Sequence, residues 1–265
     1  MIISKQIWTN FQLVKEKSPL IHNITNYVVM NSTANALLAV GASPVMAHAV
    51  EEVEDMVRIA NALVINIGTL SPKWIEAMKL AIKEANRLNK PVVLDPVGAG
   101  ATNFRNQTIA ELLETGKFSV IRGNASEIIA MVSALHRTKG VDSTSTVHQA
   151  LESAEFLCKK FGNVVCISGK TDIIISNDMR TRIFNGHEMM SKVTGLGCTA
   201  TAVIGAFLSV ENDPFMATVS AMAIMGVAGE LAAKSSAGPG SLQLNLLDKF
   251  YNMSEQEFNQ TIKVE

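Results

Sequence analysis

The amino-acid sequence predicts an α/β protein with a mostly parallel central sheet, helices on both faces and an antiparallel edge. Its 265 residues are 48% hydrophobic and only 18% charged, so the chain can bury a substantial core. Short apolar runs typical of buried strands alternate with amphipathic helical stretches, which is the pattern of strand–helix units around a parallel sheet. No internal repeat or low-complexity linker interrupts this pattern, and we therefore expect one domain over residues 1–265.

The first predicted strand–helix unit covers residues 63–88. An apolar run at 63–68 is followed by a helix over 72–88, in which apolar residues recur at helical spacing. Ser71 can cap this helix, and Pro72 suits its first turn. The same alternation continues along the chain, with strands at 91–95 and 119–122 and helices at 102–114 and from 125 onward.

The pattern changes after a helix predicted over residues 147–161. Three short strands follow at 164–168, 172–176 and 181–184, and Asn177-Asp178 marks a turn between the last two. Because short turns join antiparallel strands, we expect the sheet to end in an antiparallel edge.

Two apolar helices are predicted nearer the C-terminus. One forms from the run 200–210, and the other covers 214–229, which carries no charged side chain. The second segment is shorter than the roughly 20 apolar residues that cross a bilayer, and it is bounded by Asp213 and Glu230. We therefore expect a helix buried in the protein core.

A glycine turn before the 200–210 helix is the most informative motif. Gly195 and Gly197 precede Cys198 there. Glycines let a ligand approach the main chain, and a helix start offers N–H donors and partial positive charge, so the turn predicts a site for an anion such as phosphate. We expect the pKa of the Cys198 thiol to be lower than that of a free cysteine. A plain helix entry with a buried cysteine is the alternative, because short glycine patterns recur by chance.

Four residues at the ends of predicted strands form a second candidate set. Gly68, Asp95, Arg122 and Ser168 each follow or end an apolar run. Ligands of open α/β sheets gather beyond the carboxyl ends of the strands, so we expect the fold to bring these residues into one cleft.

Gly169-Lys170-Thr171 resembles the end of a phosphate-binding P-loop but does not predict one. The first glycine of that motif is missing at the required spacing, and a strand follows where a helix is needed. The glycine turn is therefore the better candidate for gripping phosphates.

Charge and cysteine content exclude several classes of partner. The net charge of -1 comes from 23 basic and 24 acidic residues spread along the chain, so no nucleic-acid surface is expected. The three cysteines cannot all pair and lack metal-ligand spacing, as expected of reduced thiols. The N-terminus lacks the uninterrupted apolar stretch of a secretory signal. We expect a cytoplasmic protein with a small-molecule substrate and no membrane partner.

The glycine turn is one of several motifs that match a known group. Thr194-Gly195-Leu196-Gly197-Cys198 is similar to the anion-hole signature of ribokinase-like small-molecule kinases, and Asn124-Ala125-Ser126-Glu127 resembles the motif by which they organise magnesium. Most members carry aspartate at the position of Cys198, whereas cysteine there is characteristic of the hydroxyethylthiazole kinase family. The chain resembles that family from about Ser18 to Leu247. Further shared blocks lie at 24–26, 42–47, 66–69, 94–100 and 121–124.

The resemblance implies a ribokinase-like fold and ATP-dependent phosphorylation of the primary hydroxyl of 4-methyl-5-(2-hydroxyethyl)thiazole, in thiamine biosynthesis or salvage and with magnesium as cofactor. It also implies a homotrimer with active sites between subunits, where a neighbour contributes Asn26 and Met46. Residue by residue, it assigns catalysis to Cys198, Gly195 and Gly197, substrate contacts to Asn26, Met46, Gly68 and Gly195, nucleotide contacts to Arg122, Ser168, Thr194 and Gly197, and the magnesium site to Asp95 and Glu127. Cys198 is expected to accept the proton of the substrate hydroxyl. Asp95 and Glu127 could hold magnesium directly or through its waters.

Two other functions stay open at this point. A nucleotide-dependent hydrate dehydratase of the same superfamily also uses an anion hole and ATP, but aspartate is expected at its key position, so Cys198 argues against it. A non-catalytic sensor of nucleotides or thiamine precursors would bind ATP without releasing ADP.

Overall fold

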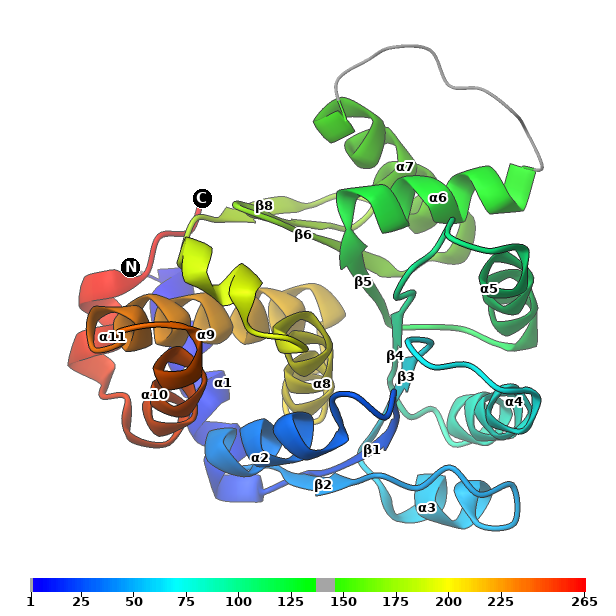
Figure 1. Ribbon diagram of the computed structural model, residues 1–265, viewed down its shortest axis with the longest axis horizontal. Helices are drawn as coiled ribbons and strands as arrows, with labels where there is room; N and C mark the ends of the chain where they lie inside the picture. Colours follow the sequence, from blue (N-terminus) through cyan, green and yellow to red (C-terminus); the bar gives the residue numbers. More distant parts are fainter. Residues whose placement is uncertain (1, 137–145) are drawn as a thin grey trace.

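The computed structural model describes residues 2–136 and 146–265, and within these ranges the strands form one eight-stranded sheet (Figure 1). The strand order is β2-β1-β3-β4-β5-β6-β7-β8. The first six strands are parallel, whereas β7 and β8 run antiparallel at one edge. The strands are β1 (Leu20–Ile24), β2 (Ser43–Val45), β3 (Ala62–Asn66), β4 (Val92–Asp95), β5 (Val120–Asn124), β6 (Val164–Ser168), β7 (Asp172–Ile175) and β8 (Arg180–Ile183).

Helices cover both faces of the sheet. In Figure 1, α1, α2, α8, α9, α10 and α11 lie on one side of it, and α3 to α7 lie on the other. The helices are α1 (Ile2–Lys17), α2 (Met30–Val40), α3 (Val53–Ile59), α4 (Pro72–Arg87), α5 (Asn103–Thr115), α6 (Ala125–His136), α7 (Thr146–Phe161), the 3₁₀ helix η1 (Glu188–Lys192), α8 (Leu196–Leu208), α9 (Pro214–Lys234), α10 (Pro239–Asn252) and α11 (Glu255–Thr261).

Each face of the sheet buries its own hydrophobic core. Side chains alternate along a strand, so Val93 of β4 joins the core that contains α8 and α9, while Val92 and Leu94 join the core that contains α4 and α5. Burial on both faces explains why these strands appear in the sequence as continuous apolar runs.

The predicted fold class is confirmed, including the helices on both faces and the antiparallel edge. Boundaries differ where they matter for the site. Strand β3 ends at Asn66, so Gly68 lies beyond the strand, and β5 continues past Arg122 to Asn124. Helix α8 begins at Leu196 rather than near residue 200, so Gly197 and Cys198 belong to its first turn. The elements before residue 62 were not predicted, and among them β2, with three residues, leaves little apolar pattern.

The segment predicted as an apolar core helix forms α9, which extends to Lys234. Among the described residues it is the one helix that is long and apolar enough to cross a membrane. However, 89% of its most apolar window is buried inside the protein, where α1, α8 and α10 pack against it. The prediction of a core helix is therefore confirmed.

Candidate active site

Helix α8 begins at a backbone turn that favours glycine. Gly195, its N-cap residue, has a φ of 86°, and a Cβ there would lie 2.5 Å from Val29 Cγ1. No side chain caps the helix. The first amides of α8, on Leu196, Gly197 and Cys198, have no intrahelical acceptor and are available to a ligand.

Arg122 lies against this turn from β5. The guanidinium can approach because Gly197 has no side chain: a Cβ on Gly197 would lie 2.8 Å from Arg122 Nη1. Arg122 Nη2 donates to Ser168 Oγ on β6 at 2.7 Å. Burial lowers the pKa of Arg122, but the nearby Asp95 and Asp172 outweigh this effect, so the net shift is upward and the guanidinium stays charged.

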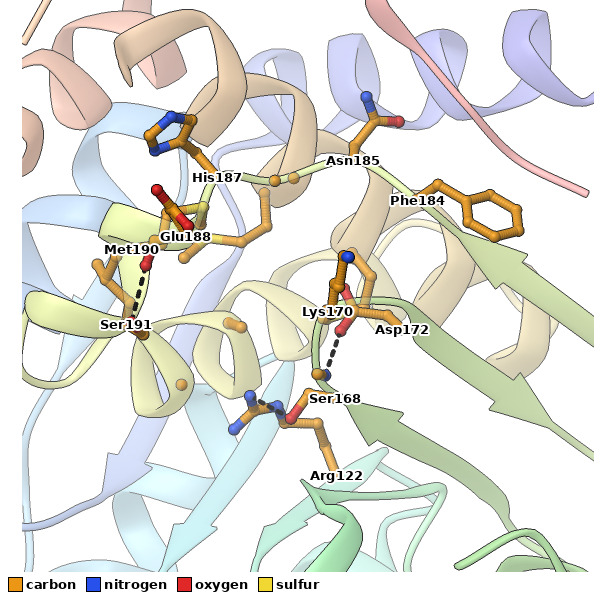
Figure 2. A pocket seen from close by; sticks show the side chains of 18 residues that line it. Arg122, Ser168, Lys170, Asp172, Phe184, Asn185, His187, Glu188, Met190 and Ser191 are labelled. Atoms are coloured by element: carbon orange, nitrogen blue, oxygen red, sulfur yellow. Dashed lines mark hydrogen bonds between the residues drawn. The ribbon is translucent and has the colours of Figure 1, made fainter. Parts of the chain in front are cut away.

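A cavity of about 720 Å³ lies next to Arg122 and the start of α8. Figure 2 shows Arg122 and Ser168 at one end of this cavity and Asn185 at the other. Its wall comes from the β6–β7 turn, from the segment between β8 and η1, and from the facing sides of α8 and α9. The cavity thus extends away from the predicted anion site, and Phe184, Met222 and Met225 are among the apolar side chains that line it.

The β6–β7 turn brings Lys170 and Asp172 to the cavity wall (Figure 2). Gly169 N donates to Asp172 Oδ1 at 3.0 Å, which fixes the turn. Burial raises the pKa of Asp172 to about 6, although the Gly169 hydrogen bond and Arg122 oppose the shift. Lys170 is exposed, so its ammonium is accessible to a ligand. Gly169 and Lys170, which do not form a P-loop, therefore line the cavity as part of the β6–β7 turn.

Asp95 ends β4 and is held by two neighbours. Its Oδ2 accepts hydrogen bonds from Asn66 Nδ2 at 2.9 Å and from Thr201 Oγ1 at 2.8 Å. Its Oδ1 is buried and has no hydrogen-bond partner among the described residues. Burial raises the pKa of Asp95 to about 6, while Arg122 opposes the shift. One carboxylate oxygen is therefore left for a cation.

Asn26, just beyond β1, connects this group to the thiol. Its Nδ2 donates to Asn66 Oδ1 at 2.9 Å and to Cys198 Sγ at 3.4 Å. Gly68 N donates to the same Asn66 oxygen at 2.9 Å. The predicted substrate contacts Asn26 and Gly68 thus lie beside the predicted catalytic thiol. The expectation that Asn26 reaches this site from a neighbouring subunit is wrong, because Asn26 of the same chain already contacts Cys198.

The expected acidity of Cys198 is also wrong. Burial raises the pKa of its thiol to about 11, and the charge of Asp95 adds to the shift. The hydrogen bonds from Asn66 and Asn26 and the charge of Arg122 oppose it but are weaker. The helix N-terminus alone suggested a low pKa, and burial of the thiol, assisted by the nearby Asp95 carboxylate, reverses that expectation.

The remaining predicted residues have different surroundings. Both carboxylate oxygens of Glu127 accept backbone hydrogen bonds, Oε1 from Gly98 N at 2.9 Å and Oε2 from Asn124 N at 2.8 Å. Thr194 is exposed in the turn before α8 and does not line the cavity. Met46 follows the edge strand β2 and is half-buried.

Topology brings the strand-end residues together in two pairs, since Arg122 bonds Ser168 and Gly68 is linked to Asp95 through Asn66. Arg122 and Ser168 line the cavity, whereas Gly68 and Asp95 do not, so one cleft shared by all four stays a prediction. Sequence reasoning missed Asn66 and Thr201. Asn66 stands at the true end of β3, which was predicted to continue to residue 68. Thr201 lies one helical turn after Gly197, a spacing that could have placed it on the same face of α8.

Comparisons with known proteins point to one family. The model of the hydroxyethylthiazole kinase family matches residues 11–256. The hydroxyethylthiazole kinase of Leptospira biflexa serovar Patoc is 54% identical over 260 residues, which cover 98% of this chain and 97% of that protein. The enzyme of the same name from Syntrophus aciditrophicus is 53% identical over 264 residues, or 99% of this chain and 98% of that protein.

Solved structures of kinases share the fold of this chain. The structure of a hydroxyethylthiazole kinase protein from Pyrococcus horikoshii OT3 superposes with a TM-score of 0.91 at 42% identity and covers 98% of both chains. The pyridoxal kinase from Staphylococcus aureus in complex with AMP-PCP and pyridoxal has a TM-score of 0.66 at 18% identity, covering 93% of this chain and 98% of that one, and shares the fold alone.

Proposed function

The chain belongs to the hydroxyethylthiazole kinase family, and from this premise we propose that it transfers the terminal phosphoryl group of ATP to the primary hydroxyl of 4-methyl-5-(2-hydroxyethyl)thiazole in thiamine metabolism. One observation carries the proposal. Gly197 lines the large cavity together with Arg122, and the next residue, Cys198, is contacted by Asn26. The free amides at the start of α8 therefore lie between a cavity that can hold a nucleotide and a thiol that can meet an alcohol.

We assign the nucleotide to the 720 Å³ cavity, which is within the size range of small-molecule sites. Arg122 and the amides of α8 lie at one end of it, where they would hold the terminal phosphates. Ser168 keeps Arg122 in place through its 2.7 Å hydrogen bond. Thr194, at the turn, is expected to contact the phosphates from outside the cavity.

Phosphoryl transfer needs positive charge and alignment more than covalent help from the protein. Negative charge spreads over the oxygens of the transferred group in the transition state. The Arg122 guanidinium lies against the start of α8, so together with the amides of Gly197 and Cys198 it would stabilise that charge.

The residues present fit a magnesium ion. Asp95 Oδ1 is buried and has no partner in the described part of the chain, which is a cost that a cation would remove. Glu127 fits a different role, because both of its oxygens already accept backbone amides. We propose that Asp95 lies closest to the ion and that Glu127 holds one of its waters. Magnesium, when bound, would neutralise phosphate charge.

Cys198 is proposed to contact the substrate hydroxyl. With a pKa of about 11 the side chain is a neutral thiol at pH 7, so it does not begin the reaction as a ready base. In a loose transition state the hydroxyl proton leaves late. Sulfur can therefore align the hydroxyl and assist proton removal modestly, which makes Cys198 helpful to catalysis but not indispensable.

Asn26 and Gly68 are proposed to bind the thiazole beside Cys198, with Gly195 closing the site from the turn. Met46 is proposed to pack on the heteroaromatic ring from a neighbouring subunit, since a thioether beside an aromatic ring contributes roughly 0.3 to 1.5 kcal/mol.

We also propose a homotrimer, which the family resemblance implies and which would bring Met46 of one subunit to the site of its neighbour. Tyr27 and Val28 directly follow Asn26 and are 63% and 67% exposed, and Tyr27 packs beside Trp74 in a tilted arrangement with ring centroids 4.6 Å apart. Such an exposed apolar surface beside the substrate site suits contact with a second copy of the chain. We further propose a single domain that works in the cytoplasm, which its free thiols suit.

A coupled assay for ADP formation tests the proposal. The purified protein is incubated with ATP, with and without magnesium, and with a panel of heteroaromatic alcohols that includes the thiazole alcohol and the pyrimidine precursor of thiamine. ADP release that requires both the thiazole alcohol and magnesium is the expected result. Tight ATP binding without ADP release from any alcohol would favour a sensor, and turnover of a hydrated nicotinamide nucleotide would favour the dehydratase.

A further inference from the structure

Asn66 occupies the centre of the substrate side of the site, although no functional role has been assigned to it so far. It is 1% exposed and ends β3. The sheet register pairs it with Asp95 on the neighbouring strand β4. Paired residues of adjacent strands project to the same side of a sheet, so the two side chains lie next to each other.

The two ends of the Asn66 amide serve different partners. Its Nδ2 donates to Asp95 Oδ2 at 2.9 Å. Its Oδ1 accepts from Asn26 Nδ2 and from Gly68 N, both at 2.9 Å. The donor end therefore holds the carboxylate proposed for magnesium and also contacts the Cys198 thiol, while the acceptor end holds two groups proposed for the thiazole.

Asn26 depends on this acceptor for its orientation. Both hydrogens of its amide are used, one toward Asn66 Oδ1 and one toward Cys198 Sγ at 3.4 Å. A sulfur atom is a weak acceptor, so the bond to Asn66 is the stronger of the two. Without Asn66 the Asn26 amide would lose the contact that aims it at the thiol.

We propose that Asn66 is a positioning residue for the reaction, which sets the geometry of the thiazole contacts through its oxygen and that of Asp95 through its nitrogen. This inference rests on the proposed kinase function. Asn66 need not touch either reactant. A displacement of about 1 Å in a reacting group can cost about 100-fold in rate, so small shifts of Asn26 or Asp95 would be visible in kinetics.

Two substitutions separate the two ends of the amide. Asn66→Ala removes both. Asn66→Asp has nearly the same shape and keeps an oxygen for Asn26 and Gly68, but an ionised carboxylate cannot donate to Asp95 and repels it. Asn23→Ala is the matched control, because Asn23 is also 1% exposed on the neighbouring strand β1 and its Nδ2 donates only to Ile21 O in the described structure.

Steady-state kinetics and side-chain amide exchange are measured on all three variants. For Asn66→Ala we expect kcat to fall and the KM for the thiazole to rise, with kcat/KM lower by about 100-fold and the KM for ATP within about threefold of the parent (about 0.7 kcal/mol). For Asn66→Asp we expect a comparable fall in kcat with a nearly unchanged KM for the thiazole. Asn23→Ala should change neither parameter, even if it lowers the melting temperature.

Hydrogen exchange of the Asn26 side-chain amide, followed by NMR in the free enzyme, is a second readout that needs no catalysis. Protection should be lost in Asn66→Ala and kept in Asn66→Asp and Asn23→Ala. Equal kinetics for Asn66→Ala and Asn23→Ala, or loss of Asn26 protection in all three variants, would overturn the proposal and leave Asn66 as a packing residue. A parent enzyme inactive on every alcohol would contradict the proposed function instead, while the exchange data would still decide whether Asn66 orients Asn26. If Asn66→Ala does not fold, the same-shaped Asn66→Asp variant supplies the kinetic test.

Discussion

Arg122 Nη1 lies close to where the side chain of residue 197 would begin, since a Cβ added to Gly197 would be 2.8 Å away. In the proposed site, the guanidinium and the first amides of α8 would hold the same phosphate, and a side chain at residue 197 would push the guanidinium away from it. This contact joins β5 to α8, elements that are more than 70 positions apart in the chain.

Gly197→Ala is expected to displace Arg122 rather than unfold the protein. The clashing atom is the end of a flexible side chain, and alanine is favoured within a helix. We expect the KM for ATP to rise about tenfold, equivalent to about 1.4 kcal/mol, with little change in the free energy of unfolding. Gly240→Ala is the control, because a Cβ there meets nothing within 4 Å. An unchanged KM for ATP in Gly197→Ala would mean that Arg122 does not hold the nucleotide from this position.

Bulkier residues at both Gly195 and Gly197 should nearly eliminate activity. Gly195 adopts a φ of 86° and approaches Val29, so an L-residue there adds backbone strain to a steric clash. The N–H groups would then point away from their common target. Turnover of the double valine variant, measured with its circular dichroism spectrum, checks this result. A folded double variant with substantial turnover would contradict the assigned role of the turn.

Cys198→Ala should slow turnover without abolishing it. A positioned proton acceptor contributes about 100- to 10,000-fold in favourable cases, and a thiol with a pKa of about 11 should stay at or below the lower end. We expect kcat to fall by about 10- to 100-fold. Cys158→Ala, which removes a buried thiol elsewhere, should leave kcat unchanged. Full turnover in Cys198→Ala would remove the thiol from the chemistry.

Lys170→Ala should weaken ATP binding in a salt-dependent manner. Lys170 is exposed on the cavity wall beside Asp172 (Figure 2), and an exposed cation interacts with phosphate mostly through screened charge. We expect the KM for ATP to rise by about fivefold at low ionic strength, equivalent to about 1 kcal/mol, and by less at high ionic strength. Lys170→Arg should keep most of the affinity. Lys159→Ala removes an exposed lysine outside this cavity and should have no effect. A salt-independent loss in Lys170→Ala would point to a structural role.

Asp172→Asn should stabilise the protein at pH 7. Burial raises the pKa of Asp172 to about 6, so the folded state holds this proton more tightly than the unfolded chain does. The ionised carboxylate therefore lowers the free energy of unfolding above pH 6, by up to about 3 kcal/mol. This cost disappears as the pH falls from about 6 to about 4. The pKa of Asp95 is also raised, but Asp95 is present in both the parent and the variant. The difference between their free energies of unfolding therefore reports Asp172. Urea unfolding at pH 7 and pH 4.5 measures it. A less stable Asp172→Asn variant at pH 7 would show that Arg122 stabilises the carboxylate by more than burial costs.

Much of the architecture follows from local patterns in the chain. Strands such as β4 and β6 are buried on both faces and appear as continuous apolar runs, while α4 shows an apolar stripe with a serine cap and a proline in its first turn. The glycine turn at 195–197 can also be predicted locally, because a glycine suits the positive φ at residue 195 and an apolar helical run follows it. The predicted activity and most of the predicted site residues came from motifs shared with a known family.

Tertiary structure decided the electrostatics and the connections. A helix N-terminus favours an acidic Cys198, yet burial beside Asp95 raises its pKa to about 11. Asn66 gained its importance only when β3 and β4 aligned it with Asp95. Lys170 lines the cavity from the β6–β7 turn, which its sequence, correctly not predicted to form a P-loop, did not indicate. Backbone conformation depends on a few neighbouring residues, so the sequence determined it. A pKa or a hydrogen-bond partner depends on groups from distant segments, and only the folded chain brings them together.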